Sequence, residues 1–233
     1  MIELKNIKAG YGKKTVLNDV SVKLRDATIT VIMGANGAGK STLLKTSYGL
    51  LKPTAGQILF NDKKITPSPQ KYVEQGVFYI PQGKRVFRNM TVMENLELAA
   101  HFWKDRSIFP DRLEEVLTHF PDLKPRLSDL AGNLSGGQQQ MVAIARGLIN
   151  KPKMIMLDEP SIGLAPKLIN DVFHKVKELK DTTGTAFVIV EHNLKTLLPL
   201  TDWAYILEQG QVVYDGKSEG KTLEKMLSSV FKN

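Results

Sequence analysis

The segment at positions 34–41 constrains the fold of this chain more than any other. It reads GANGAGKS, which matches the pattern G-x-x-x-x-G-K-[ST]. The strand-like residues 28–33 precede it and a helix-prone stretch, residues 41–45, follows it. Glycines allow backbone N–H groups to turn toward an anion, and the N-terminus of the following helix adds its positive dipole. The segment therefore predicts a strand, a phosphate-binding loop and a helix.

The side chains of this loop indicate a nucleotide with a metal ion. Lys40 would reach the β- and γ-phosphates, and the Ser41 hydroxyl would coordinate Mg²⁺. Kinases, GTPases and ATPases all use such a loop, but the guanine-reading motif N-K-x-D is absent from the sequence, which argues against a GTPase. The predicted nucleotide-binding residues of the segment are Gly34, Ala35, Asn36, Gly37, Ala38, Gly39, Lys40, Ser41 and Thr42.

A second feature is an apolar stretch, residues 154–157, that ends in Asp158 and Glu159. A parallel strand beside the phosphate loop would bring Asp158 to the Mg²⁺ ion, which requires hard oxygen ligands. Glu159, one residue further, can face a water molecule aligned with the γ-phosphate and act as its general base. The pair therefore predicts phosphoryl transfer to water.

The third feature is the sequence LSGGQ at residues 134–138. Ser135 is a suitable N-cap for a helix, and Gly136 and Gly137 leave backbone N–H groups exposed. This pattern predicts a second helix start that contacts phosphate.

Composition limits the remaining possibilities. The chain has 233 residues, no cysteine and a net charge of +8. The lack of cysteine excludes disulfides, thiolate zinc sites, iron–sulfur clusters and thiol catalysis. The positive charge indicates either a polyanionic partner or a lysine-rich surface. The longest apolar runs have five residues, whereas a membrane helix needs roughly 20. Because the first residues also lack an apolar signal segment, we expect a cytosolic protein.

The order of patterns predicts an α/β fold. Short strands are expected in the first third of the chain, at residues 2–7, 16–24, 28–33 and 57–60. Residues 91–130 are helix-like, with Leu113, Val116, Leu117 and Phe120 on one face. After residue 135, apolar strands alternate with amphipathic helices, one of which is expected to carry Leu164, Leu168, Val172, Val176 and Leu179. Such alternation is typical of a mostly parallel sheet, into which the helical middle is inserted.

The three motifs together, in this order and spacing, resemble the nucleotide-binding subunit of an ABC transporter along essentially the whole chain. The resemblance implies the P-loop NTPase fold of ABC ATPases, with an antiparallel β subdomain and an inserted α-helical subdomain near residues 87–131. It also implies one ABC ATP-binding domain spanning residues 1–233.

The resemblance assigns roles to further residues. Tyr11 matches an aromatic residue that stacks on adenine, and Gln82 matches a glutamine that touches Mg²⁺ and senses the transmembrane partner. His192 matches a histidine that contacts the γ-phosphate. The implied catalytic residues are Glu159, His192 and Lys40, and the implied metal ligands are Ser41, Gln82 and Asp158.

The family's architecture implies the partners. ATP is held between the phosphate loop of one subunit and the LSGGQ motif of another, so Ser135, Gly136 and Gly137 would act on the partner's nucleotide. The expected assembly is a homo- or heterodimer of ATP-binding subunits with Mg²⁺ and ATP. It would lie at the cytoplasmic face of the membrane, on separate permease subunits, and serve a substrate-binding protein indirectly. No nucleic acid is expected as a partner.

Smaller motifs indicate a subfamily. PQGKRVF at 81–87, MTVMENL at 90–96, EPSIGLAP at 159–166 and QQQM at 138–141 resemble the ATP-binding proteins of branched-chain amino acid importers. Ala165 stands where most ABC proteins have an aspartate, a replacement that this subfamily shares. Gln82 and His192 differ from the subfamily, which usually has Glu and Gln there, but match the general ABC pattern.

Two alternatives remain open on the sequence. ATPases of lipid or lipopolysaccharide exporters have similar length and motifs. A non-transport ABC ATPase that acts on nucleic acid would suit the positive charge, although such proteins usually carry tandem cassettes, zinc cysteines or long coiled-coil insertions, which this sequence lacks.

Overall fold

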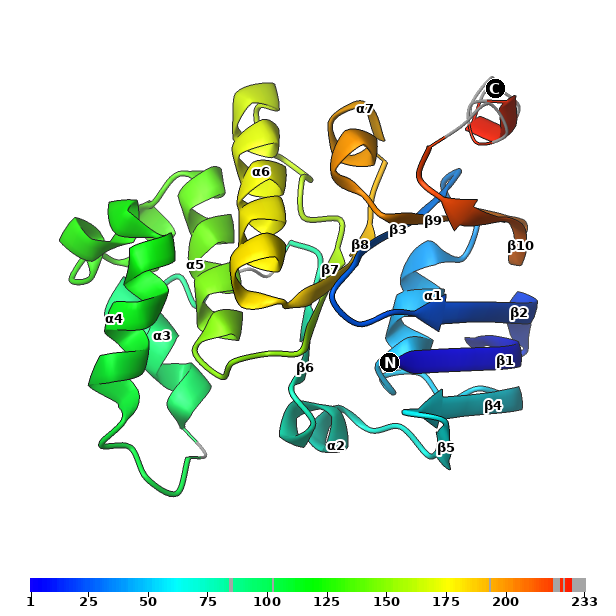
Figure 1. The fold of residues 1–233 in the computed structure, drawn as a ribbon, viewed down its shortest axis with the longest axis horizontal. Helices are drawn as coiled ribbons and strands as arrows, with labels where there is room; N and C mark the ends of the chain where they lie inside the picture. Colours follow the sequence, from blue (N-terminus) through cyan, green and yellow to red (C-terminus); the bar gives the residue numbers. More distant parts are fainter. Residues whose placement is uncertain (84–85, 102, 193, 220–222, 224, 228–233) are drawn as a thin grey trace.

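The protein folds into two β-sheets flanked by helices (Figure 1). The computed structural model describes residues 1–83, 86–101, 103–192, 194–219, 223 and 225–227. One sheet is antiparallel and has the order β2-β1-β4-β5. Its strands are β1 (Ile2–Tyr11), β2 (Lys14–Leu24), β4 (Ala55–Phe60) and β5 (Lys63–Ile65).

The other sheet has the order β10-β9-β3-β8-β7-β6 and is parallel except for the pair β9 and β10. Every residue of β3, β7 and β8 is buried, as expected for central strands covered on both faces. This explains why their sequences are nearly continuous apolar runs. The strands are β3 (Ile29–Gly34), β6 (Val77–Ile80), β7 (Met154–Asp158), β8 (Ala186–Val190), β9 (Trp203–Glu208) and β10 (Gln211–Lys217).

The helices divide between the two faces of the parallel sheet. They are α1 (Lys40–Ser47), α2 (Pro69–Glu74), α3 (Val92–Glu97), α4 (Phe109–His119), α5 (Gly136–Leu148), α6 (Pro166–Thr183) and α7 (Leu194–Leu197). Leu43 of α1 belongs to a core cluster with Leu4 of β1 and Ile32 of β3, so α1 packs between the two sheets. On the opposite face, Val31 shares a second core cluster with residues of α4, α5 and α6.

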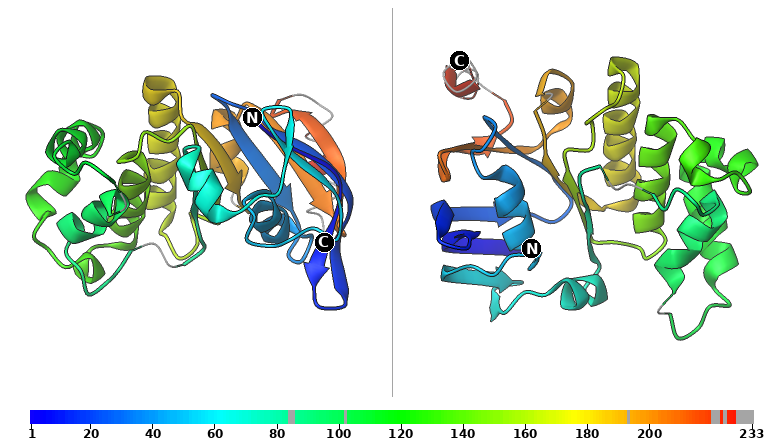
Figure 2. Two further views of the ribbon diagram at one scale, coloured as in Figure 1. Left: turned by 90° about the horizontal axis from the view of Figure 1, so that it is seen from below. Right: turned by 180° about the vertical axis from the view of Figure 1, so that it is seen from behind.

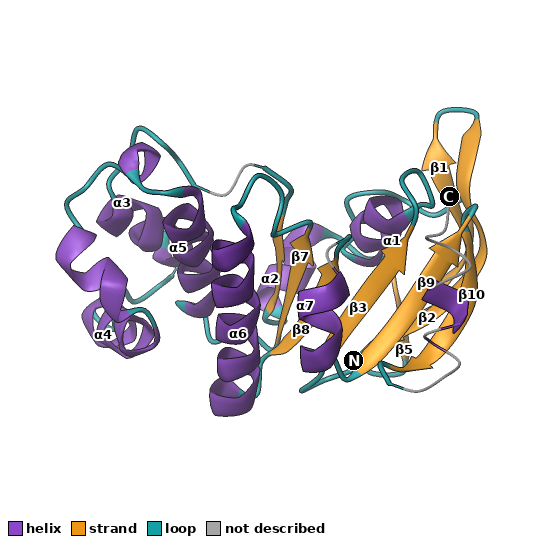
Figure 3. Cartoon of the chain, turned by 90° about the horizontal axis from the view of Figure 1, so that it is seen from above, coloured by secondary structure: helices purple, strands orange, loops and turns teal. Residues whose placement is uncertain are grey.

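The helical part lies at one end of the molecule and the antiparallel sheet at the other (Figure 3), a division that the views from below and behind also show (Figure 2). Between residues 91 and 133 the structure has α3, α4 and three short 3₁₀ segments: Leu98–Ala100, Pro121–Arg126 and Ala131–Asn133. Leu113, Val116 and Leu117 are buried, which confirms the predicted face of α4. No helix in the described part of the chain is long and apolar enough to cross a membrane.

One helix differs from its predicted extent. The apolar stripe predicted to begin at Leu164 starts later, because α6 begins at Pro166 and Leu164 lies in the preceding turn. Proline is favoured at the first position of a helix, where no backbone N–H is needed. Leu168 is only partly buried, and the stripe that faces the core is Ile169, Val172, Phe173, Val176 and Leu179.

Candidate nucleotide-binding and catalytic site

Four neighbouring strands of the parallel sheet end at the same edge, in the order β3-β8-β7-β6. Lys40 follows β3 after the phosphate loop, and His192 follows β8 by two residues. Asp158 ends β7, and Gln82 follows β6 by two residues. The carboxyl ends of parallel strands are the usual place for ligands in such sheets. The fold thus brings the predicted residues into one row, although the chain visits the strands in a different order.

The phosphate loop encloses a pocket of about 340 Å³ in front of α1. Gly34 and Gly39 have φ values of 149° and 104°, which disfavour residues with a Cβ atom. A Cβ atom on Gly34 would lie 2.2 Å from the carbonyl oxygen of Leu207, so this position also lacks room for one. The pocket is lined by Tyr11, Lys14, Val16, Asn36, Gly37, Gly39, Lys40, Ser41, Thr42 and Glu159.

The ammonium group of Lys40 is directed into this loop. Lys40 is only 5% exposed, and its Nζ atom donates hydrogen bonds to the carbonyl oxygens of Gly34, at 3.0 Å, and Ala35, at 2.9 Å. Burial lowers the pKa of Lys40, while the carboxylates of Glu159, Asp158 and Glu191 act in the opposite direction. The loop therefore holds a buried cation whose ammonium group donates to two backbone carbonyl oxygens.

Asp158 accepts hydrogen bonds on both carboxylate oxygens. Ser41 Oγ donates to Oδ1 and the Tyr79 hydroxyl donates to Oδ2, each at 2.8 Å. Burial, the negative charge of Asp158 and its hydrogen bond raise the pKa of Tyr79, so this hydroxyl remains a donor at neutral pH. Sequence reasoning did not identify Tyr79 as a site residue. The available signal was an aromatic residue with a hydroxyl group near the end of the strand that precedes Gln82.

The oxygens of Ser41 and Asp158 fit a Mg²⁺ ion better than a soft metal. No group of three or more His, Cys, Asp or Glu side chains that could hold a metal occurs in the part of the chain that the structure describes. Mg²⁺ commonly binds through one or two protein oxygens together with substrate phosphates. The donor set is therefore suited to a metal that arrives with a nucleotide.

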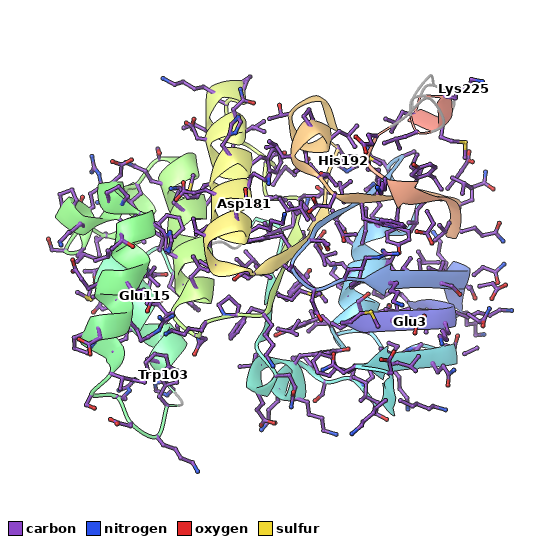
Figure 4. All side chains as sticks on the ribbon, viewed as in Figure 1. Glu3, Trp103, Glu115, Asp181, His192 and Lys225 are labelled. Atoms are coloured by element: carbon purple, nitrogen blue, oxygen red, sulfur yellow. The ribbon has the colours of Figure 1, made fainter. Side chains whose placement is uncertain are left out.

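Glu159 is held by side chains that follow the strands on either side. Gln82 Nε2 donates to Oε2 at 2.6 Å, and His192 Nε2 lies 3.0 Å from Oε1. The backbone of Glu159 has a φ of 49°, in the left-handed region, and its N–H donates to the carbonyl oxygen of Val190. Figure 4 places His192 near the centre of the molecule, away from Trp103 and Glu115 in the helical part.

Glu191, which sequence reasoning did not single out, is a second buried carboxylate at this edge. It is 2% exposed and accepts hydrogen bonds from the backbone N–H groups of His192, at 2.7 Å, and Ser161, at 3.3 Å. It joins the segment after β8 to the segment after β7. An acidic residue directly after an apolar strand, as at Glu159, was the available signal.

Tyr11 lies at the end of β1 and is 50% exposed at the mouth of the pocket. An exposed ring beside a phosphate loop can stack on a nucleotide base. The position is compatible with the predicted contact to adenine.

The LSGGQ motif lies elsewhere. Ser135 caps α5 and forms a capping box with Gln138, and none of Ser135, Gly136 and Gly137 lines the pocket. Helix α5 lies with the helical part, whereas α1 lies beside the antiparallel sheet (Figures 1 and 3). The structure therefore does not bring this motif to the phosphate loop of its own chain. The motif PQGKRVF is only partly described, because residues 84–85 lie outside the described residues.

A phosphate loop with an acidic strand end beside it defines a P-loop NTPase. A family model described as ABC transporter matches residues 17–162, which is more than half of the chain. The chain therefore belongs to the ABC transporter family, as an ATP-binding subunit with the family's ATPase activity.

Two relatives match nearly the full chain. The high-affinity branched-chain amino acid transport ATP-binding protein BraG of Pseudomonas aeruginosa is 40% identical over 214 residues, which cover 91% of each chain. The probable branched-chain amino acid transport ATP-binding protein LivF of Archaeoglobus fulgidus is 36% identical, over 99% of each chain.

Solved structures agree with the fold. The ADP conformation of an ATP-binding cassette of an ABC transporter has a TM-score of 0.86 and 33% identity, and the match covers 100% of this chain and 96% of that one. A dimeric post-hydrolysis state of an ATP-binding cassette bound to ADP and Pi has a TM-score of 0.80 and 27% identity, over 94% of this chain and all of that one. The predicted ABC ATPase fold is confirmed.

Proposed function

We propose that this protein is the ATP-hydrolysing subunit of an ABC importer for branched-chain or other hydrophobic amino acids. The names of BraG and LivF support the substrate class, because both match over nine-tenths or more of the chain. The motifs at residues 90–96 and 159–166 support the same subfamily.

The observation that carries the catalytic part is the contact of Gln82 and His192 with the two oxygens of Glu159. Glu159 accepts a proton from a water molecule as its oxygen forms a bond to the γ-phosphorus and the bond to the β-phosphate oxygen breaks. His192 contacts the γ-phosphate, and Lys40 neutralises charge on the β- and γ-phosphates.

Ser41, Asp158 and Gln82 would hold the Mg²⁺ ion, which supplies positive charge at the phosphate oxygens. Backbone N–H groups of the loop and the start of α1 surround the phosphates, and Tyr11 stacks on the adenine.

The working unit is a dimer at the cytoplasmic face of a membrane permease. Ser135, Gly136 and Gly137 contact the nucleotide of the partner subunit, which agrees with their position away from their own pocket. Closure and separation of the dimer are transmitted to the permease by the helical insertion near residues 87–131. A substrate-binding protein acts upstream of the permease.

The test of the substrate class is reconstitution. The subunit is placed in vesicles with the permease subunits and the binding protein of a branched-chain amino acid importer, and ATP-dependent uptake of labelled leucine, isoleucine and valine is measured. We expect uptake with the wild-type subunit and no uptake with the Glu159→Gln variant. ATP-dependent extraction of lipid without amino acid uptake would instead identify an exporter. Stimulation of the ATPase by RNA or DNA, without transport, would favour the nucleic acid class.

A further inference from the structure

A column of tyrosine rings connects the antiparallel side of the core to Asp158. The ring centroids of Tyr79 and Tyr48 are 5.4 Å apart with an interplanar angle of 25°, and those of Tyr48 and Tyr72 are 5.7 Å apart with an angle of 14°. Tyr79 ends the column, and its hydroxyl contacts Oδ2 of Asp158. We propose that Tyr79 is a positioning residue that orients the Asp158 carboxylate for the metal ion of the nucleotide.

The orientation of Asp158 requires a second contact. The terminal torsion of an aspartate side chain has broad wells, so one hydrogen bond fixes a single oxygen and leaves the plane of the group less defined. Ser41 fixes Oδ1 on the side of the phosphate loop, and Tyr79 fixes Oδ2 on the side of β6. With both contacts, Oδ1 stays beside Ser41, where the proposed Mg²⁺ site lies.

The sheet and the column hold Tyr79 itself in place. Strand β6 pairs with β7 in parallel register, with Tyr79 opposite Met156, two residues before Asp158. The Tyr48 ring stacks on the Tyr79 ring, and Tyr48 is only 6% exposed. Strand pairing and ring stacking therefore both fix the position from which the Tyr79 hydroxyl reaches Asp158.

A purely packing role for Tyr79 would need only its ring. The neighbouring Tyr72 shows this, because its hydroxyl is buried and has no hydrogen-bond partner in the described part of the chain. The column thus accommodates a ring whose hydroxyl makes no hydrogen bond, whereas the hydroxyl of Tyr79 has a specific acceptor. Tyr72 therefore provides a matched control, since the same Tyr→Phe change in the same column removes a hydroxyl that contacts no metal ligand.

The inference rests on the proposed role of Asp158 as a Mg²⁺ ligand. Groups that orient a metal ligand typically change metal affinity or activity by roughly 10- to 100-fold when they are removed. Tyr79→Phe keeps the ring and the stacking but leaves Oδ2 of a buried carboxylate without its donor. The change should act on nucleotide binding only when Mg²⁺ is present, because Lys40 and the loop remain unchanged.

The experiment compares the full-length wild-type chain with Tyr79→Phe and Tyr72→Phe. A fluorescent ATP analogue is titrated in excess EDTA and in a Mg²⁺ series, and phosphate release is measured at each Mg²⁺ concentration. For Tyr79→Phe we expect an unchanged Kd in EDTA, and about 10-fold more Mg²⁺ for half-maximal tightening of binding and for half-maximal rate. At saturating Mg²⁺ the kcat of Tyr79→Phe should approach that of the wild type. The Mg²⁺ concentration that gives half the maximal rate should stay higher than in the wild type. Tyr72→Phe should match the wild type in every measurement.

Other results overturn the inference. An unchanged Mg²⁺ requirement in Tyr79→Phe would show that the hydroxyl does not position Asp158. Equal weakening in EDTA and in Mg²⁺ would show that Tyr79 only supports the fold. If the Tyr79→Phe variant does not fold, Tyr79→Met, which retains apolar volume without a hydroxyl, takes its place. If the wild type binds the nucleotide with the same Kd in EDTA and in Mg²⁺, the result contradicts the proposed metal site on which the role of Tyr79 rests.

Discussion

His192 Nε2 lies 3.0 Å from Oε1 of Glu159, although the two residues are 33 positions apart in the chain. They meet because β8 and β7 are adjacent and parallel and end at the same edge. Gln82, after the next strand, contacts the other oxygen of Glu159. The carboxylate is thus oriented by two side chains of its own chain.

Replacing Glu159 by Gln should stop turnover and retain ATP. The amide keeps the shape of the side chain but cannot accept a proton, a role that contributes roughly 10²–10⁴ to the rate. Removing one negative charge near the γ-phosphate should also ease closure of two subunits over ATP. Phosphate release and size-exclusion chromatography with ATP measure the two effects. Glu74→Gln, an exposed carboxylate on α2, is the control, and near-normal phosphate release by Glu159→Gln would refute its role as the base.

Replacing Lys40 by Ala should remove most of the affinity for Mg-ATP. Hydrogen bonds to charged groups contribute about 1.5–3 kcal/mol, which corresponds to a roughly 10- to 150-fold weaker Kd. Titration with a fluorescent nucleotide measures the change. Lys63→Ala, on the exposed edge strand β5, removes the same charge far from the loop and should bind normally. Equal Kd values for the two variants would contradict the assignment of Lys40.

Replacing Ser135 by Arg should abolish hydrolysis while dilute monomer still binds ATP. The residue contacts the partner's nucleotide in the proposed dimer, and it lies outside the pocket of its own chain. The variant also loses the cap of α5, which costs about 1 kcal/mol. Ser68→Arg removes the comparable cap of α2 and is the control for that loss. Loss of ATP binding by monomeric Ser135→Arg, but not by Ser68→Arg, would contradict action on a partner's nucleotide.

Replacing Gly210 by Ala should destabilise the protein and weaken nucleotide binding. The glycine has a φ of 78°, and a Cβ atom would lie 1.9 Å from the carbonyl oxygen of Val16. Its N–H donates to the carbonyl oxygen of Ala38, so a displaced backbone would also move the phosphate loop. We expect the free energy of unfolding to fall by at least about 1–3 kcal/mol, which is the usual cost of a strained backbone conformation.

The matched control for this change is Gly184→Ala. Gly184 has a similar φ of 72°, but a Cβ atom there would meet nothing within 4 Å. Both substitutions carry the strain of the left-handed backbone, and only Gly210→Ala adds the steric clash. Denaturant unfolding curves measure the difference, and equal losses would show that crowding against Val16 is unimportant.

Local patterns predicted the buried central strands of the parallel sheet. The strand before the phosphate loop and the strand at residues 154–158 are confirmed, because full burial leaves a nearly continuous apolar run. The hairpin of β9 and β10 was not among the predicted elements. Its turn uses Gln209 and Gly210, both with positive φ, a two-residue signal that the apolar pattern alone does not contain.

Long-range contacts set the limits of prediction at the site. The sequence predicted Asp158 and Glu159 because both follow one apolar strand, and the resemblance predicted Gln82 and His192. The hydrogen bonds of Tyr79 and Glu191 depend on which strands are neighbours in the sheet. Neighbouring strands here are separated by long stretches of sequence, so no local pattern reveals these pairs.

The sheet order has a consequence for how such a protein can diversify. Strands β6 and β7 are neighbours in the sheet, yet the chain between them contains helices α3, α4 and α5. Adjacent strands stay about 4.8 Å apart whatever the length of the chain that joins them. Insertions or deletions in the segment that joins α3 to α4 therefore leave β6 and β7 paired, and the spacing between Gln82 and Glu159 unchanged. The helices can therefore change in length and sequence while the sheet edge that carries Gln82, Asp158 and Glu159 keeps its dimensions.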